Sequence, residues 1–345
     1  MKTTARIEFI KLKEIFQPIS NELLIIDDII TSIYRNFDGQ IMKQVFEVLI
    51  NSPGKRIRPA LLILSAHAAL THKNGTKMLD ISLFRIAAAI ELIHQGSLLH
   101  DDLLDCAVMR HGMKTVNAAW GNKTAIFLGD YVFARAFNLL ALCGDQIVLN
   151  YLGDTVKMMC EGELIQIINR GNFSMSREYI MSIINQKTSS LFASSCYLGA
   201  MSVSEDERIR EGMRKYGVNF GMAFQLIDDL RDIVDNCEKL GKYPLQDIQS
   251  GDITLPLHCL FNAIDTEKRD DLQKKLKFFT NNSKADKLSK ICFDTGVFSE
   301  IVEVIEFHIN EMKNALAILP NSDYKVSLCK LADYMNQIIS KVLSF

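Results

Sequence analysis

The distribution of proline is the feature that most restricts what this chain can fold into. The 345 residues contain six prolines, and none lies between Pro59 and Pro244. Because proline removes a backbone donor and clashes with the preceding helical turn, a proline-free run of this length favours helices. Apolar residues also recur at helical spacing, as at Leu83, Ile86 and Ile90. We therefore expect an all-α fold of about ten or more helices.

Short polar segments divide this helical pattern. They lie at residues 72–77, 170–174, 202–206 and 281–286. The sequence shows neither an internal repeat nor a low-complexity linker that would separate two cores. We expect a single domain over residues 1–345.

Composition excludes several classes of partner and location. The chain has 39 Lys and Arg against 41 Asp and Glu, a net charge of −2, so no global field favours binding to nucleic acid. The N-terminus has no signal-like apolar run, and charged residues interrupt the long apolar stretches, which predicts no transmembrane segment. The eight cysteines form no CxxC pair and are expected to be buried, reduced thiols of a cytoplasmic protein.

Two acidic motifs share one spacing. Asp101, Asp102 and Asp105 lie in "HDDLLD", and the same DDxxD pattern returns 127 residues later (228 − 101) as Asp228, Asp229 and Asp232. A single copy would be typical of a solvated helix face. Two copies, each following apolar residues, bring together like charges that repel by roughly 4 kcal/mol per close pair. Hard oxygen ligands without thiols favour Mg²⁺, which bridges carboxylates to substrate phosphates.

A basic motif provides the complement to these anions. "GKRIRP" contains Lys55, Arg56 and Arg58 at a loop-to-helix junction, where arginine can grip phosphate oxygens bidentately. In isolation it would be typical of a surface basic patch. Beside two acidic motifs it indicates a second anion site. Further candidates are Arg110, Lys187 and Lys242.

The motifs, in their order, resemble those of the trans-polyprenyl diphosphate synthases. The resemblance rests on "GKRIRP", "ELIHQGSLLHDDLLD", "GDYVFARAF", "EGELIQ", "KTSSLF", "FQLIDDLRD" and "GDITLPL". It covers residue 12 to the C-terminus and is strongest to the catalytic component of heptaprenyl-type synthases. It implies a bundle of mostly antiparallel helices around a deep central cavity. It also implies condensation of an allylic diphosphate with isopentenyl diphosphate, dependent on Mg²⁺, with three ions when substrate is bound.

The resemblance also assigns site residues. The metal ligands would be Asp101, Asp102, Asp105, Asp228, Asp229 and Asp232. The allylic diphosphate would contact Arg110, Lys187, Thr188, Gln225 and Lys242. Isopentenyl diphosphate would contact Lys55, Arg58, His94 and His111.

Three departures from the family pattern stand out. His111 replaces the second of two arginines that usually follow the first motif, so charge at that position depends on pH. "SPGK" replaces the usual Gly-Gly-Lys. Tyr243 and Leu245 occupy positions where proline and glycine are common, in the segment that would cover the second motif.

Small residues before the first motif suggest a long product. Gly96 and Ser97 precede Asp101 by five and four positions, and Ile93 lies one turn further back. In short-chain members of the family an aromatic residue at the position of Gly96 or of Ser97 closes the tunnel for the growing chain. An open tunnel predicts an all-trans hexaprenyl to octaprenyl product for quinone side chains. The alternative is that glycine at position 96 permits close helix packing.

Two other functions are compatible with these motifs. A class I terpene cyclase would share the first motif, and a regulatory subunit could bind a prenyl diphosphate without turnover. The resemblance implies a homodimer or a heteromer with a small noncatalytic subunit. It also allows loose membrane association for product release.

Overall fold

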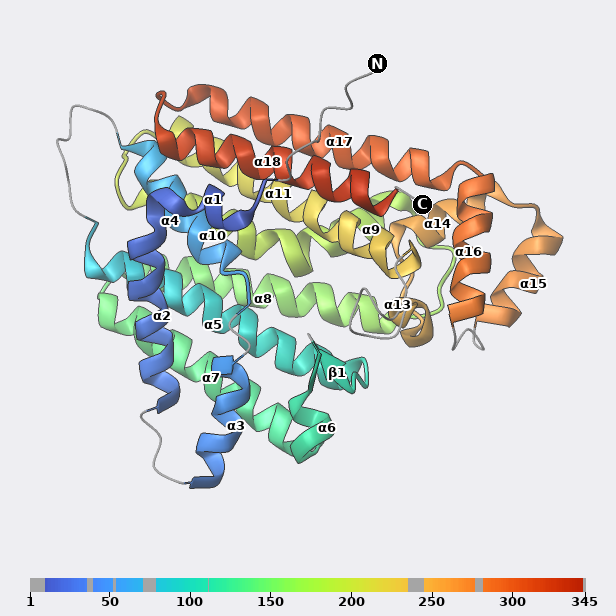
Figure 1. Ribbon diagram of the computed structural model, residues 1–345, viewed down its shortest axis with the longest axis horizontal. Helices are drawn as coiled ribbons and strands as arrows, with labels where there is room; N and C mark the ends of the chain where they lie inside the picture. Colours follow the sequence, from blue (N-terminus) through green and yellow to red (C-terminus); the bar gives the residue numbers. More distant parts are fainter. Residues whose placement is uncertain are drawn as a thin grey trace, which may run out of the picture.

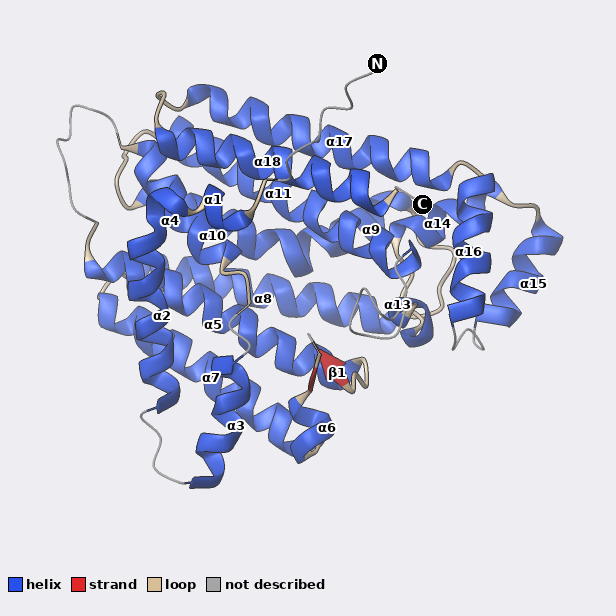
Figure 2. Ribbon diagram, viewed as in Figure 1, coloured by secondary structure: helices blue, strands red, loops and turns tan. Residues whose placement is uncertain are grey.

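Long helices make up almost all of the described chain (Figures 1 and 2). The computed structural model describes residues 10–35, 40–51, 54–70, 79–110, 112–234, 245–276 and 282–343. His111, Lys242 and Tyr243 lie outside these ranges, as does the expected break at 72–77.

The all-α prediction is confirmed, with more than ten helices in the described ranges. The elements that precede the β-hairpin are α1 (Leu12–Ile15), η1 (Gln17–Ile19), α2 (Ser20–Arg35), α3 (Gln40–Asn51), α4 (Ile57–Ala69) and α5 (Ile81–Leu104). The middle elements are α6 (Val116–Trp120), α7 (Asn122–Cys143), α8 (Gln146–Ile168), α9 (Arg177–Ile184), η3 (Asn185–Ser189), α10 (Ser190–Met201) and α11 (Glu207–Val234). The last are α13 (Gln246–Ser250), α14 (Leu255–Ala263), α15 (Thr266–Leu276), α16 (Asn282–Asp294), α17 (Val297–Ala315), η4 (Leu316–Ile318) and α18 (Asp323–Val342).

One small β-hairpin interrupts the helices. Strands β1 (Met109–Arg110) and β2 (Met113–Lys114) pair antiparallel directly after α5. The sequence did not predict it, because two-residue strands are too short to show an alternating pattern. It is the small strand element in Figure 2.

The long helices run back and forth, so that three of them end together. In Figure 1 α5, α8 and α11 run in one direction and α7, α10 and α17 return. α5 packs along α7, and α11 packs against both α10 and α17. The ends of α5, α8 and α11 therefore meet at the end of the bundle that carries β1 and α13 (Figure 1).

Local residues explain where several helices begin and end. Asp80 caps α5 by accepting a hydrogen bond from the Ser82 amide at 2.7 Å, and Asp145 caps α8 in the same way. The predicted breaks at 170–174 and 202–206 are confirmed as connections on either side of α9 and α10. The break expected at 281–286 is wrong for residues 282–286, which form the first turns of α16.

Buried apolar side chains form one contiguous core cluster among the described residues. Tyr216 and Phe192, from α11 and α10, are among its largest fully buried members. The seven cysteines in the described ranges are all free. The expectation that they are buried is wrong for Cys106 and Cys160, which are exposed.

Among the described helices, α7 alone meets the length and composition expected of a membrane span. Within residues 124–143 only Asp130 and Arg135 are charged. About a third (33%) of its most apolar window is buried, where α7 lies along α5 in the bundle. A core helix of a bundle can meet the same criterion, so α7 does not contradict the sequence prediction of no transmembrane segment.

Candidate active site

The first acidic motif ends α5 and is partly neutralised by the hairpin that follows. Asp105 is the C-terminal cap residue of α5, and Asp102 is buried. Arg110 on β1 turns back and donates from its Nε to Asp102 Oδ1 at 2.7 Å. The hairpin thus places the guanidinium of Arg110 beside the acidic motif that precedes it in the chain.

The second motif lies on the last two turns of α11. Asp228 is exposed, whereas Asp229 and Asp232 are buried. Gln225 donates to Asp229 Oδ1 at 2.8 Å, and the Thr188 hydroxyl donates to the amide oxygen of Gln225 at 2.8 Å. These bonds fix the direction of the Asp229 carboxylate.

Lys187 lies on a π-helical turn, η3, between α9 and α10. Such turns alter the direction of successive side chains and occur frequently at functional sites. Lys187 forms an ion pair with Glu163 of α8 and donates to Gln166 at 3.5 Å. Gly162 permits the approach, because a Cβ at that position would lie 2.9 Å from the Lys187 amide nitrogen.

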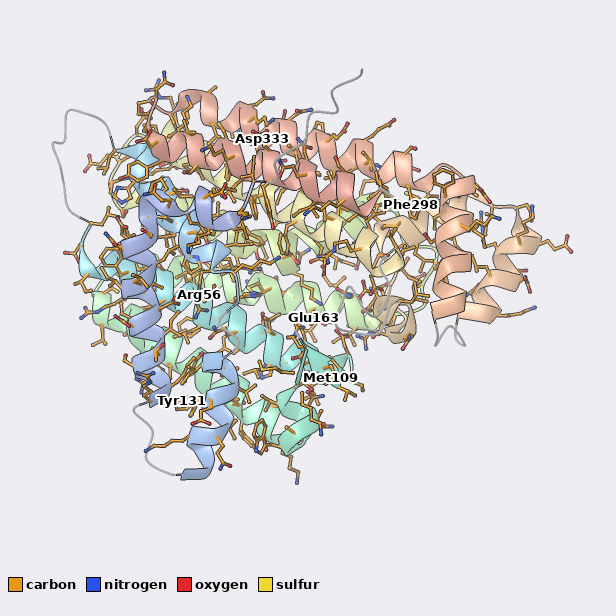
Figure 3. The ribbon with its side chains drawn as sticks, viewed as in Figure 1. Arg56, Met109, Tyr131, Glu163, Phe298 and Asp333 are labelled. Carbon is orange, nitrogen blue, oxygen red and sulfur yellow. The ribbon has the colours of Figure 1, made fainter. Side chains whose placement is uncertain are left out.

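A pocket joins the two motifs. It has a volume of about 90 Å³ and is lined by Asp105 of the first motif, Asp229 of the second, and Lys187 between them. The apolar side of the pocket includes Ile180 and Ile184 of α9. Glu163, which pairs with Lys187, lies near the middle of the molecule in Figure 3.

Burial and mutual repulsion shift the pKa values of carboxylates in this pocket and of Asp101, which does not line it. Burial raises the pKa of Asp101 to about 6, with Glu163 and Asp105 adding to the effect. Burial likewise raises the pKa of Asp229 to about 7. For Lys187 burial lowers the pKa, but the charges of Asp101, Glu163 and Asp105 outweigh it and raise the pKa overall. The pocket therefore concentrates negative charge around one protonated lysine.

A second group of cations lies near the start of α4. Arg58 is 9% exposed, its guanidinium lies 4.0 Å from the centre of the Phe192 ring, and its Nε has no hydrogen-bond partner among the described residues. Burial lowers the pKa of Arg58 to about 10. Burial, followed by the charges of Arg58, Arg110 and Arg56, lowers the pKa of His94 well below 6.5. Arg58 is therefore a buried cation whose Nε is bonded to no carboxylate among the described residues, which suits a bound anion.

Arg56 and Lys55 of the basic motif differ in their contacts. Arg56 has left-handed backbone angles (φ 52°) and bonds Asp27 at 2.6 Å and Glu91 at 2.9 Å, so it anchors the loop to α2 and α5. Lys55 lies at the surface with partial desolvation of its ammonium group. This desolvation and the charge of Arg231 lower its pKa overall, and the charge of Asp228 opposes the shift. Lys55 thus extends from the basic motif toward the second acidic motif.

Comparison with known proteins decides the family. Polyprenyl synthetase sequences match residues 39–294, about three quarters of the chain. The chain belongs to the polyprenyl synthetase family. It is a polyprenyl diphosphate synthase, a prenyltransferase, and the resemblance inferred from the motifs is confirmed.

Individual relatives support the assignment along most of the chain. The octaprenyl diphosphate synthase of Escherichia coli is 30% identical over 297 residues, which cover 86% of this chain and 90% of the relative. Heptaprenyl diphosphate synthase component 2 of Bacillus subtilis is 30% identical over 293 residues (84% and 80%). The crystal structure of a polyprenyl synthase from Caulobacter crescentus, complexed with calcium and isoprenyl diphosphate, has a TM-score of 0.86 and 28% identity, covering 94% and 97% of the two chains.

The donor set of the synthase fits the divalent metals that its family uses. Among the described residues, no group of three or more Asp, Glu, His or Cys side chains forms a ready-made metal cage. Mg²⁺ binds one or two carboxylates and completes its shell with water and phosphate oxygens. Asp101 and Asp105 on one side and Asp228 and Asp229 on the other could supply such pairs.

The structure also places the residues expected to set chain length. Ile93 and Gly96 are buried, and the Ser97 hydroxyl donates to the His94 carbonyl at 2.8 Å. A Cβ on Gly96 would lie 3.0 Å from the ring of Phe133 on α7. Gly96 therefore accommodates an aromatic ring from the neighbouring helix, as the close-packing alternative requires.

Several residues of the site, among them Asp247 of the pocket lining, were not assigned from the sequence. Glu163 and Gln166 lie within the matched motif "EGELIQ", and Asp252 lies within "GDITLPL". Their place in these motifs could have indicated that all three belong to the site. Arg170 belongs to no matched motif and contacts Asp252 and Asp105.

Proposed function

We propose that this synthase extends an allylic diphosphate with isopentenyl diphosphate, using Mg²⁺, to an all-trans hexaprenyl to octaprenyl diphosphate for a quinone side chain. The observation that carries the proposal is the pocket in which Asp105 and Asp229 face Lys187. The pocket is lined by one carboxylate from each motif and by the cation Lys187. Such a lining would suit a diphosphate that binds together with metal ions.

The allylic diphosphate would bind in this pocket. Mg²⁺ bound there would neutralise charge on the departing diphosphate and so help to break the allylic C–O bond. Lys187 would contact the diphosphate as a point charge, and Thr188 and Gln225 would hold Asp229 in position. Arg110 would change partner from Asp102 to a phosphate oxygen.

Isopentenyl diphosphate would bind between Lys55, Arg58 and His94. His94 is neutral at physiological pH because its pKa is low, so it can donate one N–H to a phosphate oxygen. The double bond of this substrate attacks the allylic cation, a new C–C bond forms, and a proton leaves to the released diphosphate. No protein nucleophile is required.

The product length depends on the space beside α5. Phe133 lies against Gly96, so we propose that this ring forms part of the tunnel wall and that Gly96 keeps it from being pushed into the tunnel. Ile93 continues the apolar wall one turn earlier.

The proposed assembly is a homodimer through α7 and α8. These neighbouring helices carry exposed apolar side chains, among them Phe127 (71% exposed) and Leu164 (57%). Exposed apolar surface of this kind marks interaction sites. A heteromer with a small noncatalytic subunit is the alternative. Sedimentation of the purified chain separates the two, because a homodimer forms without any partner.

Product analysis tests the proposed reaction. The enzyme is incubated with Mg²⁺, farnesyl diphosphate and labelled isopentenyl diphosphate, and the products are separated by chromatography. We expect linear products in the hexaprenyl to octaprenyl range. A product that ends at geranylgeranyl diphosphate contradicts the chain length, and a cyclised product contradicts the reaction. Binding without turnover, with the homodimer intact, would favour a regulatory role.

A further inference from the structure

Arg170 connects two acidic residues that come from distant parts of the chain. It follows α8, and its Nε donates to Asp252 Oδ1 at 3.0 Å while its Nη2 lies 3.5 Å from Asp252 Oδ2. The same Nη2 lies 3.4 Å from Asp105 Oδ1 in the first acidic motif. Beside this fork the amide of Gly171 donates to the carbonyl of Gly251 at 2.7 Å. The end of α8 is thus joined to the segment around Asp252 by both side chain and backbone.

The segment around Asp252 is joined to the second motif at its other end. The amide of Asp252 donates to the Asp247 carbonyl at 2.8 Å, and the amide of Asp247 donates to Asp232 Oδ2 at 3.3 Å. The amide of Leu245 donates to the Asp232 carbonyl at 3.1 Å. A continuous path therefore runs from Asp105 through Arg170 and this segment to Asp232.

The charges make Arg170 hard to replace. Asp252 is 5% exposed, and its charge raises the pKa of the neighbouring Asp105, whose pKa is already raised by burial. Burial lowers the pKa of Arg170, but its bonds and charge interactions with Asp252 and Asp105 outweigh this and raise it. A buried carboxylate that loses its cation is strongly destabilising, whereas a pair neutralised together costs much less.

We propose that Arg170 is a positioning residue that holds the 245–252 segment, and with it Asp232, at a fixed distance from Asp105. The inference rests on the proposed roles of the two motifs as metal sites, but the structural link can be measured without metal or substrate. Arg170 acts through the two carboxylates that it joins.

The first arm of the test is amide hydrogen exchange of the metal-free protein. In Arg170→Gln the amides of Asp247 and Asp252 should exchange about tenfold faster, which corresponds to a loss of about 1.4 kcal/mol in the local opening equilibrium. The exchange rates in Arg170→Lys should lie between those of the wild type and of Arg170→Gln, because a single ammonium reaches only one carboxylate well. Asp333→Asn is the matched control: it removes an ion pair with Lys313 (2.7 Å) between α17 and α18, far from Glu163 in Figure 3.

The second arm separates positioning from loss of a buried charge partner. In Arg170→Gln/Asp252→Asn the buried carboxylate of Asp252 is gone, and Asp105 keeps Lys187 as a neighbouring cation, so general stability should largely recover. The link to Asp105 stays broken, however. Binding of the inert analogue farnesyl thiodiphosphate, measured by calorimetry, should therefore still require several times more Mg²⁺ in the double variant than in the wild type. In the same variant kcat should fall while the KM for isopentenyl diphosphate is unchanged.

The outcomes are distinct. If exchange at Asp247 and Asp252 is unchanged in Arg170→Gln, or if Asp333→Asn shifts it equally, the positioning role is wrong. If the double variant recovers both stability and Mg²⁺ requirement, Arg170 only compensates the charge of Asp252. If exchange changes as expected but the wild-type protein binds no Mg²⁺ with the analogue, the metal role of the motifs fails while the link stands.

Discussion

Replacing Asp229 with asparagine should stabilise the metal-free protein at alkaline pH while it removes activity. Asp229 is 4% exposed, and its pKa is raised to about 7 by burial first and then by the charges of Asp228 and Asp232. Asparagine has nearly the same shape, carries no charge, and can still accept the hydrogen bond from Gln225. The substitution thus removes the cost of a buried charge and leaves the packing in place.

The pKa shift gives the size and the pH range of the effect. A carboxyl that binds its proton more tightly in the folded state contributes stability that is complete below about pH 4 and is lost as the pH rises through about 7. The shift of Asp229 is about three pKa units, or about 4 kcal/mol as an upper limit. Because the ionisation of Asp229 depends on the charges of Asp228, Asp232 and Lys187 around it, we expect about half of this for one substitution.

Denaturant unfolding in the presence of a chelator measures the effect. Between about pH 5 and pH 8 the stability of Asp229→Asn relative to wild type should rise by about 1 kcal/mol or more. With Mg²⁺ and an inert allylic analogue the order should reverse, because only the wild-type protein keeps the ligand carboxylate. Asp333→Asn serves as a surface control and should show no such trend. A difference between Asp229→Asn and wild type that does not depend on pH would refute the reasoning.

Four further substitutions test three separate parts of the site. Asp101→Ala or Asp228→Ala should lower turnover by orders of magnitude with unchanged helical circular dichroism, and near-normal turnover in either would contradict the metal assignment. Arg58→Met should raise the KM for isopentenyl diphosphate about tenfold or more and leave the allylic KM unchanged, since a charged hydrogen bond is worth about 1.5–3 kcal/mol; an equal rise in both constants would argue against a separate site. His111→Arg should lower the KM for isopentenyl diphosphate and flatten its rise between about pH 6 and pH 8, because unperturbed histidine titrates near 6.5; an unchanged profile would mean that His111 does not contact that substrate.

The fold was predictable because its main signals are local. Proline placement and the apolar stripe of α5 need no knowledge of distant contacts, and both act over a few helical turns. The hairpin at 109–114 was missed for the opposite reason. Its two-residue strands have no periodicity, and their position is fixed by contacts such as that of Arg110 with Asp102.

The parts of the site that carry a repeated sequence motif were predictable. The parts that form only when distant segments of the chain come together were not. The duplicated DDxxD spacing pointed to Asp105 and Asp229, and both line the pocket. Arg170 lies 65 residues from Asp105 and 82 from Asp252, in a short connection without periodicity. Nothing in its local sequence distinguishes it from a surface arginine.

Leu245 shows how the segment after the second motif depends on tertiary contacts. It occupies a position where glycine is common in the family, and its backbone is left-handed (φ 59°), a conformation that costs a side-chain-bearing residue about 1 kcal/mol or more. The leucine side chain is nevertheless 1% exposed, and full burial of a leucine contributes about 1.5–3 kcal/mol. The strain is therefore offset only while the segment stays docked on α11. Since the bonds of Asp232 and Arg170 hold its two ends, loss of either should release a segment that local sequence alone does not keep in place.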